Sequence, residues 1–186
     1  MKPFCFLRSP LTQALAQRRL LSCAVFSSFA LLAAPQAGAV MMDIGSFPGA
    51  GSIRNLEISA DGQVVAGVAA SADYQVFYWS ADKGFTPTGS KLSLIADVYG
   101  VSGDGSVIVG RGGSVAGNPD VRAFRWTAAT GFTDLGTFGG KNSQAYGVSD
   151  DGNVVVGVAG DAANKYHAFR WTETGAMQNL GALAQH

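Results

Sequence analysis

The chain has little cysteine, little histidine and little charge. Its 186 residues include two cysteines, Cys5 and Cys23, and two histidines, His167 and His186, and only 14% of the residues are charged. Because both cysteines lie near the N-terminus, the rest of the sequence offers no disulfide, thiolate nucleophile or cysteine metal site. A fold beyond residue 23 must be stabilised by packing and hydrogen bonding.

The first 39 residues differ in composition from the rest. Four basic residues without an acidic one precede an apolar run at residues 20–34, and the small residues Ala37-Gly38-Ala39 follow it. A secretory signal peptide has these three parts, whereas a spanning helix needs about 20 apolar residues. We predict a signal peptide at residues 1–39, cleaved after Ala39. The predicted location is the periplasm, the extracellular medium or the cell surface of a bacterium.

Three other interpretations of this segment are open. The run stays uncleaved as an N-terminal anchor, Cys23 is lipidated after Leu20-Leu21-Ser22, or Arg18-Arg19 belongs to a twin-arginine signal. Serines interrupt the run, polar residues precede the cysteine, and the residues after the arginine pair match that signal poorly. The sequence therefore favours the cleaved secretory signal.

Residues 40–186 carry nine basic and thirteen acidic side chains, a net charge of −4, with no cluster of lysine or arginine. Nucleic acids and anionic membranes attract basic patches. We therefore expect no nucleic-acid partner, and no membrane partner after signal cleavage. These 147 residues suffice for one domain with a single core.

This part of the chain is a repeat. The segments ISADGQVVAG, VSGDGSVIVG and VSDDGNVVVG align without a gap from Ile58, Val101 and Val148, at spacings of 43 and 47 residues. Each is followed by a tryptophan segment, FYWS, FRWT or FRWT, at Trp79, Trp126 and Trp171. Repeats of roughly 40 to 50 residues are typical of propellers, solenoids and arrays.

Each repeat predicts four short strands. The pairs Asp61-Gly62, Asp104-Gly105 and Asp151-Gly152 lie between apolar runs, as in two-residue hairpin turns. The tryptophan segment is the expected third strand and a Leu-Gly segment the fourth. We predict an all-β fold of tandem four-stranded antiparallel repeats, β-propeller-like blades, in a domain at residues 40–186 with units at about 43–89, 90–136 and 137–183. The tryptophans should be buried between neighbouring blades.

Three units are fewer than the roughly four to eight blades of a typical closed propeller. Asp43-Ile44-Gly45 matches the segment after the later tryptophans, so we expect it to be the fourth strand of a unit whose other strands are missing. An open stack, or a piece of a larger repeat protein, is the predicted arrangement.

The later units resemble the bacterial extracellular repeats known as HAF repeats. The third unit reads His167-Ala168-Phe169-Arg170-Trp171-Thr172, with Leu180-Gly181 after it. The second reads Arg122-Ala123-Phe124-Arg125-Trp126-Thr127, then Asp134-Leu135-Gly136-Thr137-Phe138-Gly139-Gly140, and the first departs as Gln75-Val76-Phe77-Tyr78-Trp79-Ser80. The resemblance covers about residues 43–183. It implies an exported tandem-repeat protein related to autotransporter passengers, and it brings no catalytic residues with it.

Residues that could carry chemistry have a structural interpretation. His167 is unique to one unit and lacks partners for zinc. Ser59, Ser102 and Ser149 recur without a repeated histidine, which favours turn capping over nucleophilic catalysis. Asp150 and Asp151 supply too few oxygens for Ca²⁺, which takes about 6 to 8. We predict no catalytic residue, cofactor site or metal site.

The position before each tryptophan holds Tyr78, Arg125 or Arg170. A flat side chain suits stacking on an aromatic ring, and the arginines could instead pair with an acid such as Asp134. The position therefore predicts a contact that stabilises the blade.

The sequence indicates the function less directly than it indicates the fold. The first hypothesis is an exported structural or adhesive repeat module, not an enzyme, that binds an unknown protein or glycan partner or associates with itself through open repeat faces. The alternative is a propeller-type glycan hydrolase or lyase, for which Asp97, Asp120 and Glu173 depart from the repeat without forming a recognisable carboxylate pair. A truncated fragment without independent function is the remaining possibility.

Overall fold

The structure, a computed structural model, describes residues 41–70, 73–113, 115–117 and 119–181. The predicted signal peptide lies outside these residues. The described part of the chain holds eleven β-strands and one short helix, the 3-10 turn η1 (Val115–Gly117). The strands are β1 (Ser52–Ile58), β2 (Val64–Ala70), β3 (Tyr74–Ser80), β4 (Gly84–Val101), β5 (Val107–Gly113), β6 (Val121–Thr127), β7 (Gly131–Asp134), β8 (Gly139–Val148), β9 (Val154–Asp161), β10 (Tyr166–Thr172) and β11 (Ala176–Asn179).

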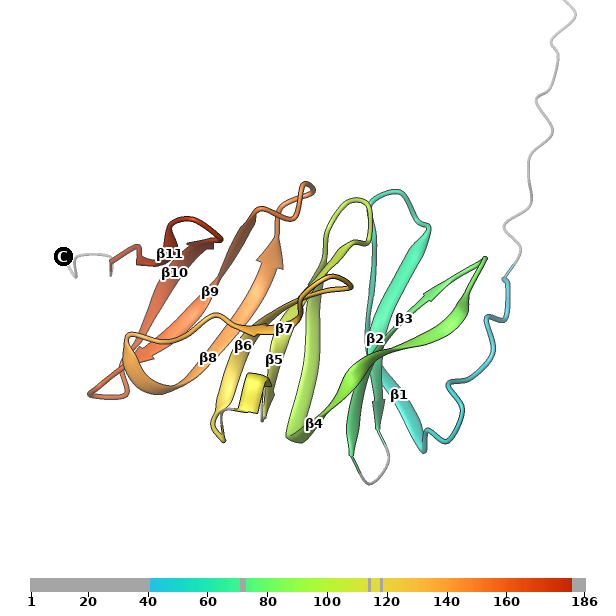
Figure 1. Ribbon diagram of the computed structural model, residues 1–186, viewed down its shortest axis with the longest axis horizontal. Helices are drawn as coiled ribbons and strands as arrows, with labels where there is room; N and C mark the ends of the chain where they lie inside the picture. Colours follow the sequence, from blue (N-terminus) through green and yellow to red (C-terminus); the bar gives the residue numbers. More distant parts are fainter. Residues whose placement is uncertain (1–40, 71–72, 114, 118, 182–186) are drawn as a thin grey trace, which may run out of the picture. The chain divides into compact units, whose positions relative to one another are not determined.

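The strands form three antiparallel four-stranded sheets that follow one another along the chain (Figure 1). The first sheet consists of β1, β2, β3 and the first half of β4, and the third of β8, β9, β10 and β11. The second sheet begins with the second half of β4, because this 18-residue strand pairs first with β3 and then with β5. The predicted all-β, four-stranded antiparallel repeat is confirmed.

The Asp-Gly turns are built alike in all three sheets. The Ser102 hydroxyl donates to Asp104 Oδ1 and accepts from the Val107 N–H, and Asp104 Oδ1 also accepts from the Ser106 N–H. Ser59 and Ser149 make the same bonds in the other two turns. Turn capping by these serines is therefore confirmed.

The Leu-Gly segments are not strands, which corrects the prediction. β7 and β11 end before Leu135 and Leu180, because an Asx turn follows in which Asp134 Oδ1 accepts from the Gly136 N–H and Asn179 Oδ1 from the Gly181 N–H. Gly136 takes a φ of 90°, which ends the extended backbone.

The same turn corrects the prediction for residues 43–45. Asp43 Oδ1 accepts from the Gly45 N–H, and residues 41–51 form no strand. Phe47, two residues further, packs on Phe77 and Phe85 of the first sheet at ring-centroid distances of 5.4 and 6.1 Å. This segment is therefore the equivalent of the connection that runs from β7 into the third sheet.

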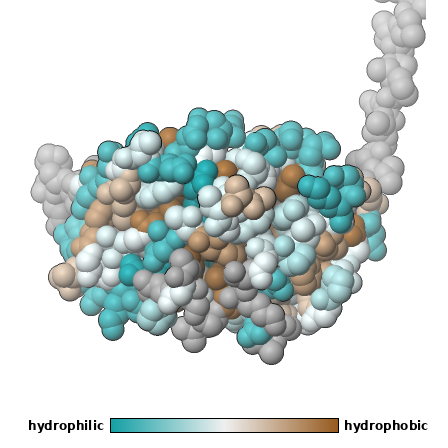
Figure 2. Space-filling view, in the orientation of Figure 1, coloured by the Kyte–Doolittle hydropathy of each residue, from teal (hydrophilic) through white to brown (hydrophobic). Residues whose placement is uncertain are grey.

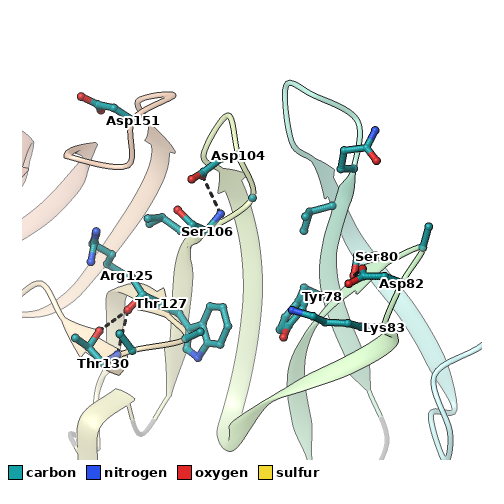
Figure 3. A pocket seen from close by; sticks show the side chains of 18 of the residues that line it. Tyr78, Ser80, Asp82, Lys83, Asp104, Ser106, Arg125, Thr127, Thr130 and Asp151 are labelled. Carbon is teal, nitrogen blue, oxygen red and sulfur yellow. Dashed lines mark hydrogen bonds between the residues drawn. The ribbon is translucent and has the colours of Figure 1, made fainter.

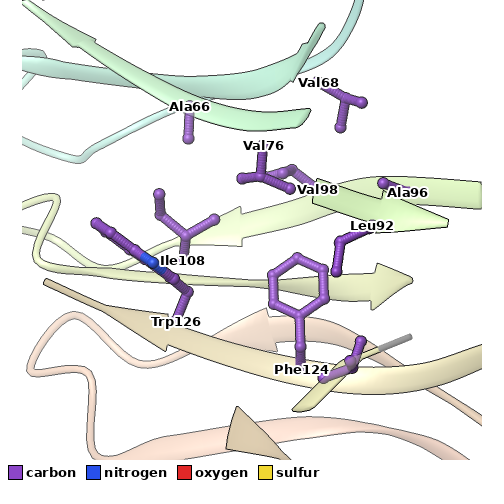
Figure 4. Close-up of a cluster of buried hydrophobic side chains, with 10 residues drawn as sticks. Ala66, Val68, Val76, Leu92, Ala96, Val98, Ile108, Phe124 and Trp126 are labelled. Carbon is purple, nitrogen blue, oxygen red and sulfur yellow. The ribbon is translucent and has the colours of Figure 1, made fainter. Parts of the chain in front are cut away.

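The core lies between the sheets and not within one layer. Alternate residues of a strand face opposite sides. Ala66, Val68 and Val76 of the first sheet thus meet Ile108 and Trp126 of the second (Figure 4). A second cluster joins the second and third sheets through residues such as Val109, Ala123, Val155 and Phe169, all fully buried. Each sheet therefore depends on its neighbour to cover its apolar face.

All three tryptophans occupy the third strand of a sheet, as predicted. Trp126 is only 6% exposed, and its indole N–H donates to the Thr88 carbonyl of the first sheet at 3.2 Å. Trp171 packs against the second cluster. The prediction of burial is confirmed for Trp126 and wrong for Trp79 and Trp171, which are both half-buried. No sheet precedes Trp79 among the described residues.

Candidate functional site: a cleft between the first two sheets

A cleft of about 850 Å³ opens between the first and second sheets, at the end where the Asp-Gly turns lie (Figure 3). Its walls come from the β3–β4 turn on one side and from the β4–β5 and β6–β7 turns on the other. In Figure 2 hydrophilic residues gather along the upper rim, where Figure 1 shows the Asp-Gly turns.

The bottom of the cleft is apolar. Val64 of β2 and Val107 of β5 line it together with Tyr78 and Trp126, whose ring centroids are 5.6 Å apart. Tyr78 is half-buried, so part of its ring faces the cavity, whereas Trp126 closes the bottom. An apolar side chain or ring would be the natural occupant at this depth.

The rim is charged. Asp82 and Lys83 stand on the wall of the first sheet, and Arg125, Asp104 and Asp151 on the opposite side (Figure 3), with Glu173 completing the lining. Four acidic and two basic side chains give this lining a net negative charge. It therefore favours a ligand with basic groups around an apolar centre.

The rim carboxylates are held ionised by local hydrogen bonds. The Ser106 N–H and the Ser102 hydroxyl lower the pKa of Asp104 to about 2, and the Ser80 hydroxyl lowers the pKa of Asp82. The pKa of Asp151 is lowered chiefly by the Ser149 hydroxyl. These three carboxylates are acceptors at neutral pH and are not poised to donate protons, as a general acid with a raised pKa would be.

Arg125 binds the third sheet. Its Nε and Nη2 each lie 3.3 Å from the Gly152 carbonyl, and its guanidinium carbon lies 5.9 Å from the centre of the Trp171 ring. The stacking predicted for the position before tryptophan is therefore confirmed for Tyr78 and Arg125. Asp134 pairs with Arg122 and not with Arg125: its Oδ2 lies 3.8 Å from Arg122 Nε.

Most of the other residues considered for catalysis or metal binding lie outside the cleft. His167 Nε2 lies 2.8 Å from Asp161 Oδ2, and this contact, with backbone N–H groups, lowers the pKa of Asp161. Of the three acids considered for a hydrolase, Glu173 lines the cleft, whereas Asp97 and Asp120 do not. Asp150 lies in a turn, where its carbonyl accepts from the Gly103 N–H.

The structure contains one polar cluster that was not predicted from the sequence. Asp97 Oδ2 accepts from Arg111 Nε at 2.8 Å and from the Tyr99 hydroxyl at 3.1 Å, and Asp97 is only 8% exposed. Arg111 stands where the other units have Val68 and Val158, so both partners depart from the repeat together. That joint departure is the sequence signal that would have indicated the pair.

Among the described residues no group of three or more histidine, cysteine or acidic side chains is placed to hold a metal ion. Nor does the described part of the chain contain a helix with the length and apolar character to cross a membrane.

No protein-family model matches the chain, and no curated protein matches it. Solved structures do. TolB from Acinetobacter baumannii is 15% identical over 76% of this chain and 35% of that chain, with a TM-score of 0.54. The putative TolB from Agrobacterium tumefaciens is 15% identical over 71% of this chain and 47% of that chain, also with a TM-score of 0.54.

At this identity the likeness shows the fold. The chain is a β-propeller-type repeat protein, and the sheets of its described residues do not close into a ring. It spans between a third and a half of the length of the TolB structures that it matches.

Proposed function

We propose that the chain is an exported, non-catalytic binding module that holds a protein partner in the cleft between its first two sheets. The observation that carries this proposal is the pairing of an apolar bottom, at Tyr78 and Trp126, with a rim of ionised carboxylates. The partner that fits is a segment with one large apolar side chain between basic residues. The ionised carboxylates on the rim favour basic side chains, which a neutral glycan lacks.

Two further points support binding rather than catalysis. The lowered pKa values of Asp82, Asp104 and Asp151 suit recognition of a cation and not the general-acid step of a glycan hydrolase. The resemblance to HAF repeats and the predicted signal peptide support export and a relation to autotransporter passengers.

The test uses two short peptides that share a central tryptophan, one with flanking lysines and the other with flanking glutamates. We expect the lysine peptide to bind more tightly by about fivefold, since each exposed ion pair contributes about 0.2–1 kcal/mol. Tyr78→Ala should weaken both peptides. The exposed Ala163, in the turn after β9, serves as the control when changed to Asp. Equal affinity for the two peptides, or binding of neutral oligosaccharides alone, would refute the proposal.

A further inference from the structure

The two internal interfaces between sheets repeat the same contacts. Tyr78 of the first sheet packs on Trp126 of the second, and Arg125 of the second lies over Trp171 of the third. In both cases the residue before a tryptophan contacts the tryptophan of the next sheet. Two residues at these repeated positions lack such a contact within one chain. Among the described residues, Trp79 has no preceding sheet and Arg170 has no following one.

The glycines of the Asp-Gly turns also contact the preceding sheet in the second and third sheets but not in the first. A Cβ on Gly105 would lie 2.4 Å from Val64 of the preceding sheet, and a Cβ on Gly152 would lie 2.5 Å from Val107. The equivalent Gly62 has nothing within 4 Å of that position. All three have φ values of 71–73°, so their backbones match and only the neighbour differs.

Apolar side chains that point to the following sheet are buried in the first two sheets and exposed in the third. Ala66 and Val109 are fully buried, whereas their equivalent in the third sheet, Val156, is 44% exposed. Leu135 is 5% exposed, and its equivalent Leu180 is 59% exposed. The outer face of the third sheet, marked by Val156, Arg170 and Leu180, therefore has the surface that the second sheet buries.

The outer face of the first sheet, marked by Ile58, Trp79 and Gly62, has the complementary surface. Val101 and Val148 pack against the two clusters, whereas their equivalent Ile58 is 62% exposed. Phe47 covers Phe77 there, yet its equivalent Phe138 also packs against the cluster at the second interface. The segment at residues 43–47 thus belongs to this kind of interface and does not block it.

We infer that a second copy of this chain docks head to tail, with the outer face of its third sheet on the outer face of the first sheet. The contact repeats the interface between the second and third sheets: Arg170 lies over Trp79 and reaches the Gly62 carbonyl, as Arg125 does with Trp171 and Gly152. Val156 and Leu180 cover Ile58. A second copy fits because its exposed residues are those that complete the series.

Two copies bring six sheets together, within the range of roughly four to eight blades in closed propellers. A head-to-tail interface is heterologous, and it closes into a ring when its rotation allows. The inference is independent of the proposed peptide cleft, which lies between two sheets of one copy.

The first measurement is the mass in solution of the exported protein as the cell processes it, by light scattering or sedimentation. We expect twice the mass of one chain. A single-chain mass at every concentration would overturn the inference.

Two variants test the direction of docking. Ile58→Asp and Val156→Asp alter opposite ends at exposed positions, and each should weaken association by about tenfold or more, because every contact then buries a carboxylate without a partner. A mixture of the two should associate again, since the intact third sheet of the Ile58→Asp chain meets the intact first sheet of the Val156→Asp chain. Ala163→Asp should associate like the parent.

The outcomes separate the alternatives. If only one of the two variants loses association, the copies meet through like faces and the head-to-tail inference is wrong. If neither variant changes the mass, or if the mixture stays monomeric, the inference fails as well. Circular dichroism of each variant shows whether its fold is intact.

Discussion

The Tyr78 ring packs on the Trp126 ring at a centroid distance of 5.6 Å, across the boundary between the first and second sheets. Arg125 and Trp171 make the corresponding contact across the next boundary at 5.9 Å. A phenol and a guanidinium thus fill one structural role, because both are flat and both stack on an indole. This explains why the position before tryptophan varies in charge along the repeat.

Trp126→Ala should lower the free energy of unfolding by about 3–5 kcal/mol, as other truncations of large core side chains do. Trp79→Ala, at the half-buried equivalent position, should cost clearly less. Urea denaturation of both variants checks the ranking. A loss below about 1 kcal/mol for Trp126→Ala would contradict its role as an anchor between sheets.

The pair of Asp97 and Arg111 should behave as a unit. Asp97→Ala or Arg111→Val alone should lower the free energy of unfolding by about 1–3 kcal/mol, because each leaves the other, largely buried side chain without its ion-pair partner. The double variant should cost less than the sum, since the other units already have valine at the arginine position. Denaturation of the three variants measures the coupling, and strict additivity would speak against the ion pair.

The stability of the fold should fall at low pH as Asp104 becomes protonated. Its pKa in the folded protein, about 2, lies below the ordinary value of 3.8, so the stabilisation is complete above about pH 4 and is lost as the pH falls toward 2. Asp104→Asn keeps an acceptor oxygen but removes the titration. Thermal melts between these pH values should show a shallower decline for the variant, and an unchanged decline would count against the assignment.

The signal prediction is tested by mass spectrometry. We expect the processed protein to begin at Val40, because the small residues before it match a signal-peptide cleavage site. An intact N-terminus would indicate an uncleaved anchor. A lipid-modified N-terminal Cys23 would indicate a lipoprotein.

Much of the fold could be predicted from the repeat. Asp-Gly turns and apolar runs at a constant spacing place the first three strands of each sheet, since these signals are local. The fourth strand was misplaced, because an Asx turn at Asp134 ends it earlier than the apolar Leu135 suggests. Residues 43–45 were misassigned for the same reason.

The site was harder to predict. The cleft brings together Asp82, in the β3–β4 turn of the first unit, with Asp104 in the β4–β5 turn and Arg125 on β6 of the second unit, positions that are distant in sequence. Repeat alignment compares equivalent positions, whereas the cleft joins positions that are not equivalent. The pairing of Tyr78 with Trp126 likewise depends on which face of the strand meets the next sheet.

Tyr78 and Arg125, each directly before a tryptophan, join their sheets to the next one. A double-mutant cycle between Tyr78→Ala and Trp126→Ala measures this contact, with Tyr78→Ala and Trp171→Ala as the control pair. We predict a coupling of about 0.5–1.5 kcal/mol for the first pair, as for aromatic pairs in contact, and less than about 0.5 kcal/mol for the control. Equal coupling in the two cycles would show that Tyr78 does not join the first two sheets through Trp126.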